Sequence, residues 1–308
     1  MNENVNIGLI IISVAAYVIF APFVGGLLAG IDRKISARMQ GRCGPPLLQP
    51  FYDVFKLLGK EPVTVNAAQD FYVGCCLFFM IVTGCFFFAG LSLLLVIFTL
   101  TTASLFLVVA AYASNSPYAQ IGAERELLQM MAYEPMVLIL AVGFYFIKGG
   151  SFDVSDIVFP AEGLTSSLLG IQYLPGVFLG FLFILTIKFR KSPFDLSMSH
   201  HAHQELVKGL TTEFSGKTLA ILEISHWYEN VFLLGFVFLF FPNGSAAMII
   251  VGVVVCIAVY LLESFIDNAN ARMKWQFALN SAWIVALCFG VVNLLVLYFA
   301  VFNYGLGV

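Results

Sequence analysis

The segment Phe71–Tyr112 runs for 42 residues without a single charged side chain. A helix needs about 20 apolar residues to cross a bilayer, so this segment is long enough for two spans joined by a turn near Gly90. In the whole chain, 60% of the residues are apolar and 11% are charged, whereas soluble domains carry roughly 25% charged residues. The sequence therefore predicts a protein whose exterior faces lipid.

Six further apolar runs bring the expected number of transmembrane helices to about eight. They are Val5–Leu28, Leu127–Ile147, Leu164–Ile187, Ile221–Phe241, Ala246–Ile266 and Trp275–Phe302. No composition shift or linker divides the chain. We therefore expect an all-α integral membrane protein with a single polytopic membrane domain over residues 1–308.

The basic residues alternate between the loops that this count defines. Of the 15 Lys and Arg residues, only Lys148 falls in a loop that follows an even-numbered span. Basic loops stay in the cytoplasm, so the pattern predicts cytoplasmic loops at about 32–69, 113–126, 188–220 and 267–275. It also predicts a multi-pass protein of the cell (inner) membrane with both termini outside.

The first of these loops contains a helical pattern of its own. After Pro45-Pro46, apolar residues recur with helical spacing, at Leu47, Leu48, Phe51, Val54, Phe55 and Leu58. An amphipathic helix of this kind lies along the membrane interface or beneath a soluble partner.

Five ionisable residues fall within the predicted spans: Glu134, Glu223, His226, Glu229 and Glu263. Such groups are costly in lipid and usually serve a function. Three of them, Glu223, His226 and Glu229, are spaced by three residues and so share one face of a helix, which favours a proton relay. The alternative is that these side chains lie near helix ends and contact interfacial water.

The remaining histidines, His200, His201 and His203, cluster in a predicted loop. Three close imidazoles are a weak indication of a metal site and would also suit proton entry, but a structural or subunit-contact role is the preferred interpretation. The six cysteines form no C-x-x-C pair, so we expect no metal site or iron–sulphur cluster in this chain. The net charge of −3 offers no basic surface for nucleic acid.

The predicted cytoplasmic loops carry motifs in a fixed order. They are Met39-Gln40-Gly41-Arg42, Gly44-Pro45, Leu48-Gln49-Pro50, Ser116-Pro117-Tyr118, Ile121-Gly122-Ala123, Arg125-Glu126, Tyr133-Glu134-Pro135, Pro193-Phe194-Asp195 and Thr212-Glu213-Phe214-Ser215-Gly216. This series resembles NADH dehydrogenase subunit 1, over nearly the whole chain.

One segment departs from the quinone-reducing members of that family. They continue from a Phe-Asp-Leu motif into a short acidic segment, whereas Asp195-Leu196 is followed here by residues 197–206, which are richer in histidine than in acid. In this respect the chain is similar to the membrane anchor of energy-converting (group 4, ferredoxin-dependent) [NiFe] hydrogenases. The loss of acids argues against a quinone headgroup site.

The hydrogenase resemblance implies a non-catalytic subunit with no active site of its own. It would anchor the soluble hydrogenase module and couple ferredoxin-driven proton reduction to H⁺ or Na⁺ translocation. The implied partners are the hydrogenase large and small subunits, an iron–sulphur subunit, an antiporter-like membrane subunit, the bilayer, and ferredoxin as electron donor to the complex. The chain itself would bind no cofactor, because the iron–sulphur clusters and the [NiFe] centre would belong to partner subunits.

The resemblance also assigns residues to two roles. The ion-coupling path would comprise Glu126, Glu134, Glu213, Glu223, His226 and Glu229. The docking interface would comprise Arg42, Arg125, Arg190, Asp195, His200, His201, His203 and Glu205.

Other functions stay open at this stage. The chain could be the quinone-site subunit of a complex I-like NADH or F420H2 dehydrogenase, or belong to a formate hydrogenlyase or a carbon-monoxide-linked hydrogenase. A stand-alone ion transporter is less favoured, because the sequence shows none of the inverted repeats expected of that class.

Overall fold

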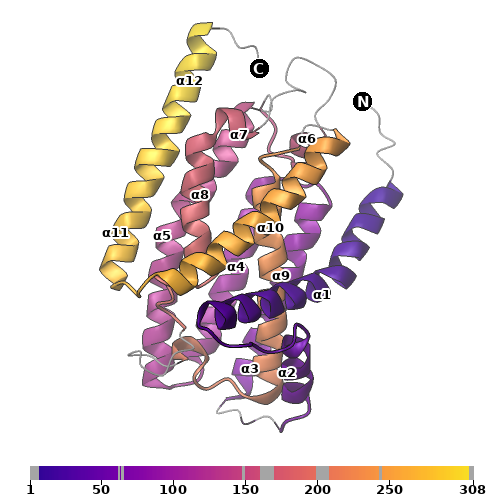
Figure 1. The fold of residues 1–308 in the computed structure, drawn as a ribbon, viewed down its shortest axis with the longest axis vertical. Coiled ribbons are helices and arrows are strands. Elements are labelled where there is room, and N and C mark those ends of the chain that lie inside the picture. The colour runs from indigo at the N-terminus through magenta and orange to yellow at the C-terminus, as the bar shows by residue number, and fades with distance from the viewer. Residues whose placement is uncertain are drawn as a thin grey trace.

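The computed structural model describes residues 7–61, 63, 66–147, 150–159, 170–198, 208–242 and 245–304. Within these residues the fold is helical and contains no named strand (Figure 1). The helices are α1 (Ile7–Met39), α2 (Gln49–Leu58), α3 (Ala67–Phe88), α4 (Leu93–Tyr112), α5 (Pro117–Ile147), α6 (Val154–Val158), α7 (Gly170–Tyr173), α8 (Pro175–Lys188), α9 (Gly216–Phe238), α10 (Ala246–Ala269), α11 (Trp275–Val285) and α12 (Val292–Tyr304). A 3-10 turn η1 (Gly209–Thr211) precedes α9, and a π-helical segment η2 (Ala286–Val291) joins α11 to α12.

Six of the described helices are long and apolar enough to cross a membrane, which confirms the all-α membrane class. They are α1, α3, α4, α5, α10 and the continuous helix Trp275–Phe299. The count of eight is not confirmed, and the two remaining spans stay predictions. One is α8, which begins at Pro175 and has 14 residues; the predicted start of this span, Leu164, lies outside the described residues. The other is α9, which has 23 residues but carries Glu223, His226 and Glu229.

The turn predicted within the apolar segment Phe71–Tyr112 is found at Gly90. Gly90 lies between α3 and α4 with φ of +80°, a left-handed conformation that glycine adopts without steric cost. The amphipathic helix after Pro45-Pro46 is also confirmed as α2. Its Val54 packs with Ala220 and Trp227, while Phe55 stays exposed.

Two predicted loops are largely helical. The first span continues through the charged residues up to Met39, and α5 begins at Pro117, ten residues before the predicted Leu127. Apolarity marks only the lipid-facing part of such helices. Their ends are set by backbone signals instead: Gly41, at φ of +73°, follows α1 as a helix-ending glycine, and proline starts α5.

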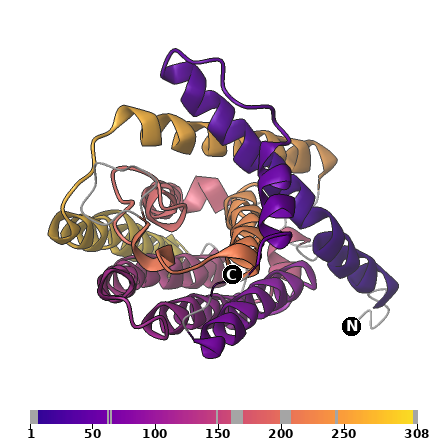
Figure 2. The same cartoon turned by 90° about the horizontal axis from the view of Figure 1, so that it is seen from below.

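The helices form a bundle around α8 and α9 (Figure 2). Seen from below, α3, α4 and α5 line one side and α10 the opposite side, with α1 running past α9. The core is aromatic, with Phe144, Phe181, Phe232, Phe236 and Phe240 fully buried. In Figure 1, α10 crosses the bundle diagonally and α11–α12 runs along its flank.

Helix α1 is held against its neighbours by close backbone contacts, which allows a stability prediction. A Cβ at Gly30 would lie 2.0 Å from the carbonyl oxygen of Leu47, whereas a Cβ at Gly74 meets nothing within 4 Å. Gly30→Ala is therefore expected to destabilise the fold by about 1–3 kcal/mol, the usual cost of overpacking. Gly74→Ala is expected to leave stability unchanged or raise it by up to about 1 kcal/mol. Thermal unfolding in detergent measures both, and equal melting temperatures would contradict the α1 packing.

Candidate functional site

Three basic side chains at the C-terminal end of α8 form ion pairs in the interior of the protein. We name residues 188–191 the basic turn; Lys188, Arg190 and Lys191 lie in it, and Arg190 adopts a left-handed φ of +52°. The turn lies where α5, α9, α10 and α1 come within side-chain reach, and each of the three cations binds acids from these helices. The turn therefore connects helices that are far apart in the sequence.

The inner cluster consists of two acids and two bases. Arg190 Nη2 lies 2.9 Å from Glu126 Oε1, and its Nη1 lies 3.2 Å from Glu229 Oε2. Lys188 Nζ lies 3.6 Å from Glu229 Oε1. All four side chains are at most 13% exposed. Burying an unpaired ion costs several kcal/mol, so the equal number of acids and bases is what makes this cluster tolerable.

Two further features keep the inner cluster charged. Lys188 Nζ also lies 4.1 Å from the centre of the Tyr133 ring, a favourable cation–π distance. Burial lowers the pKa of the Arg190 guanidinium, but the charges of Glu126 and Glu229 raise it by more, so the net shift is upward. Arg190 is thus a fixed positive charge between two carboxylates.

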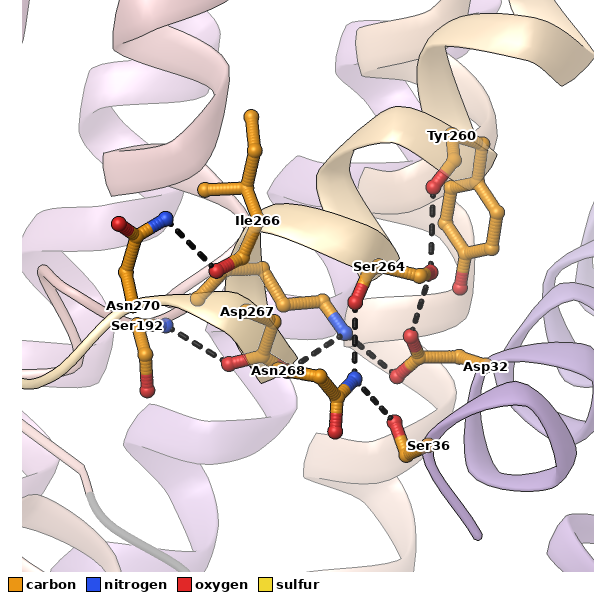
Figure 3. A network of polar contacts seen from close by, with 10 residues as sticks. Asp32, Ser36, Ser192, Tyr260, Ser264, Ile266, Asp267, Asn268 and Asn270 are labelled. Carbon is orange, nitrogen blue, oxygen red and sulfur yellow. Dashed lines mark hydrogen bonds and ion pairs between the residues drawn. The ribbon is translucent and has the colours of Figure 1, made fainter. Parts of the chain in front are cut away.

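The outer cluster consists of Lys191, Asp32 of α1 and Asp267 of α10. Figure 3 shows the two aspartates with the residues around them. Lys191 Nζ lies 2.5 Å from Asp32 and 3.4 Å from Asp267. Asp32 also accepts a hydrogen bond of 2.6 Å from the Ser264 hydroxyl, and Asp267 accepts one of 2.8 Å from the backbone N–H of Ser192. These contacts fix the basic turn to α1 and α10.

The segment that follows the basic turn is also bound on both sides. Arg272 Nη2 donates a hydrogen bond of 2.6 Å to the carbonyl of Asp195, and its Nε lies 3.4 Å from the Asp195 carboxylate. On the other side, Gln129 Nε2 of α5 donates to the carbonyl of Phe194 at 2.5 Å. A movement of this segment is therefore transmitted to both α5 and the α10–α11 connection.

A cavity of about 810 Å³ lies beside both clusters. Its lining comes from α1 and the loop that follows it, from the basic turn and the segment after it, and from α9 and α10. It includes Asp32, Arg42, Arg190, Lys191, Glu223 and His226. The cavity is large enough for a chain of water molecules or a small ligand. It places the titratable residues of α9 next to the fixed charges of the basic turn.

The structure brings several predicted path residues together. Glu126 and Glu229 meet at Arg190, and Glu223 and His226 line the adjacent cavity. Glu134 is partly buried on α5, one residue after the Tyr133 that packs on Lys188. Glu213 is also partly buried, but it lies outside the residues that form the two clusters and the cavity.

The predicted docking residues separate into three groups. Arg42 is exposed, and Arg125 lies 3.5 Å from the carbonyl of Leu196. Arg190 and Asp195 bind partners within the chain. The remaining docking predictions lie outside the described residues: His200, His201, His203 and Glu205.

Four residues of the clusters were not singled out from the sequence: Asp32, Lys188, Lys191 and Asp267. The sequence contains a signal for two of them, since Lys188 directly follows an apolar run and Lys191 comes three residues later. A cation at such a position either reaches the membrane interface or pairs with an acid. Among the described residues, no group of three His, Cys, Asp or Glu side chains is arranged to hold a metal ion.

Long apolar helices around a buried network of charges define a multi-pass membrane protein with a polar interior. The chain belongs to the NADH dehydrogenase subunit 1 family, since the family model described as NADH dehydrogenase matches residues 11–298.

Individual relatives agree with this family. The chain is 26% identical to Hydrogenase-4 component C of Escherichia coli (strain K12), over 92% of this chain and 95% of that one. It is 31% identical to a subunit of the NADH-quinone oxidoreductase of Orientia tsutsugamushi (strain Boryong), over 74% of this chain and 68% of that one. A solved structure of the membrane-bound sulfane sulfur reductase, an archaeal respiratory membrane complex, contains a chain with 28% identity and a TM-score of 0.81, covering 92% of this chain and 99% of that chain. The protein is therefore a membrane subunit of a complex I-like enzyme.

Proposed function

We propose that this chain is the membrane anchor of a ferredoxin-dependent, energy-converting [NiFe] hydrogenase, and that it couples proton reduction to H⁺ or Na⁺ translocation. The observation that carries the proposal is the basic turn. It lies in the predicted cytoplasmic loop 188–220, and its three cations pair with buried or partly buried acids of α1, α5, α9 and α10. Similarity to a hydrogenase component over nearly the full length of both chains supports the redox class. The histidine-rich segment 197–206 supports the same branch of the family.

The docking surface would be formed by the segments at the end of the bundle that holds α2 and the basic turn. The alternation of basic loops supports a cytoplasmic position for this end. The hydrogenase large and small subunits and an iron–sulphur subunit would bind there, and they would hold the clusters and the [NiFe] centre. Ferredoxin would deliver electrons to those subunits, and an antiporter-like subunit would lie beside this chain in the membrane.

The ion-coupling path would start at the cavity and continue through the inner cluster. Electron transfer in a docked module changes the local charge, and such a change alters the proton affinity of acids within a few ångströms. Glu223 and His226 face the cavity, and Glu229 and Glu126 share Arg190. A charge change at the docking surface is therefore within reach of a buried, paired network that extends between α5 and α9.

A quinone-site subunit of a complex I-like dehydrogenase is the second candidate. The 810 Å³ cavity and the similarity to an NADH-quinone oxidoreductase subunit favour it, while the histidine-rich segment in place of acids argues against it. The two candidates differ in their soluble partners. Purification of the native complex through a tag on this chain distinguishes them: we expect a [NiFe] large subunit and ferredoxin-dependent hydrogen formation. A flavin- and NADH-binding subunit with quinone reduction would overturn the proposal.

The docking role of Arg42 gives a prediction with a matched control. Arg42→Ala removes an exposed charge from the Met39-Gln40-Gly41-Arg42 motif and is expected to reduce the hydrogenase subunits retained per chain, together with activity. Arg38→Ala removes a similarly exposed charge one turn earlier, outside that motif, and is expected to retain the wild-type subunit content. Quantitative mass spectrometry of tagged complexes measures the ratio. Full retention by the Arg42 variant would remove this residue from the interface.

A further inference from the structure

Glu263 is a buried acid that takes no part in the ion pairs described above. It lies on α10 and is 1% exposed. Neither of its carboxyl oxygens has a hydrogen-bond partner among the described residues. A buried ionised carboxylate without a donor is strongly disfavoured, so this environment demands either a proton or a cation.

The outer cluster supplies the charges around Glu263. Lys191 Nζ lies 3.4 Å from the Asp267 carboxylate. Asp267 follows one turn later on the same helix face, and the neighbouring Ser264 donates its hydroxyl to Asp32 of α1 (Figure 3). Positions i and i+4 of a helix are adjacent, so Glu263 and Asp267 lie on neighbouring turns of the same face of α10.

On the other helices that pack against α10, the titratable groups either pair with another charged residue or line the cavity. On α9, His226 lines the cavity that Tyr260 and Asp267 of α10 also line. At the end of α8, Lys188 is paired with Glu229. The charge near Glu263 is therefore set by one cation, Lys191, and by the two carboxylates that it binds at 2.5 and 3.4 Å.

The charges around Glu263 disfavour an additional negative charge. Asp32 and Asp267 already outnumber Lys191, so an ionised Glu263 would add a second uncompensated negative charge, on a side chain that is only 1% exposed. Burial of a carboxylate that has no hydrogen-bond donor opposes that state. The neutral carboxyl form is the one that fits the resting arrangement.

We propose that Glu263 is a proton-exchange site controlled by the pairing of Lys191. In the resting arrangement Glu263 carries the proton and Lys191 binds Asp32 and Asp267. When Lys191 turns toward Glu263, the O–H bond of Glu263 breaks and an O–H bond forms on the Asp267 carboxylate, so the total charge is unchanged. Asp267 lines the cavity and passes the proton to water there. The use of this proton for coupling rests on the proposed function, but the protonation of Glu263 does not.

Infrared spectroscopy of the purified complex tests the proposal. At neutral pH the wild type is expected to show the carbonyl band of a protonated carboxylic acid, which Glu263→Gln loses. Glu61→Gln changes an exposed acid and is expected to keep the band. In Lys191→Met the band is expected to persist to a higher pH than in the wild type, because the variant lacks the cation that stabilises the ionised form of Glu263.

A second variant keeps the test decisive if the glutamine variant does not assemble. Glu263→Asp retains an acid but moves it by one methylene, so the band is expected to persist at a shifted frequency. A band unchanged in both Glu263 variants, or titrating identically with and without Lys191, would overturn the proposal. None of these outcomes depends on whether a hydrogenase or a quinone-reducing module co-purifies, so failure here is separable from failure of the proposed function.

Discussion

Replacing Arg190 by methionine is expected to destabilise the protein by about 3–5 kcal/mol, the cost of breaking a buried ion pair by removing one partner. Arg190 is the only group within 4 Å of both Glu126 and Glu229 among the described ion pairs. Without it, Lys188 is left to compensate two buried carboxylates. The measurement is the free energy of unfolding in detergent, from chemical or thermal denaturation.

A surface pair of the same chemistry supplies the control. Arg33 Nη1 lies 2.5 Å from Asp53 Oδ2, but both side chains are about 40% exposed. Arg33→Met is expected to cost no more than about 1 kcal/mol. Adding Glu126→Gln to Arg190→Met removes one of the stranded charges and is expected to recover part of the loss. Equal destabilisation by Arg190→Met and Arg33→Met would mean that the inner cluster is solvated and not buried.

The class of fold was accessible from the sequence because the bilayer imposes a simple rule. A span must be apolar over about 20 residues, and the uninterrupted run Phe71–Tyr112 could satisfy that rule only as two helices. Gly90 could be identified as the turn for the same reason. The helix α2 was predictable because its apolar residues repeat with helical spacing.

The ends of the helices and the short span α8 were harder to predict from the sequence than the class of fold. Hydropathy falls where α1 and α5 leave the apolar layer, but the backbone stays helical as long as no residue breaks it. The charged ends Asp32–Met39 and Pro117–Glu126 therefore looked like loops. Helix α8 is shorter than its predicted span, because Pro175 starts the helix where hydropathy alone gave no boundary.

The candidate site was predicted in part, and the missing part follows from its geometry. Periodicity on one helix relates Glu223, His226 and Glu229, since residues three apart share a face. No such rule relates Lys191 to Asp32, which is 159 positions away, or to Asp267, which is 76 positions away. Those pairs exist because the basic turn follows α8 into the space between α1 and α10, and only the tertiary structure contains that information.

The interior position of Arg190 changes how the predicted site is interpreted. The family resemblance implied a docking role for this residue, yet its guanidinium lies between Glu126 and Glu229. We therefore place it in the proposed ion-coupling path, while Arg42 stays in the proposed docking surface.

Glu134→Gln and Glu223→Gln are expected to yield assembled complexes whose rate of ion uptake falls on the order of tenfold or more, the scale of losing a proton-transferring group. Glutamine retains the shape and hydrogen-bonding capacity of the side chain but cannot bind and release a proton. Glu223 lines the cavity, and Glu134 lies beside the Tyr133–Lys188 contact on α5. Hydrogen formation is expected to slow by a smaller factor than ion uptake, so that the ratio of ions to electrons falls.

The measurement is hydrogen formation and ion uptake in sealed vesicles, with subunit content determined on the same samples. Asp156→Asn, an exposed acid between α5 and α8, is the control and is expected to retain wild-type rates. The ratio of ions taken up to electrons transferred is the decisive quantity, because a loss of assembly lowers both rates equally and leaves the ratio unchanged. A path through Glu134 and Glu223 requires that ratio to fall, so two assembled variants that retain it would make these acids structural.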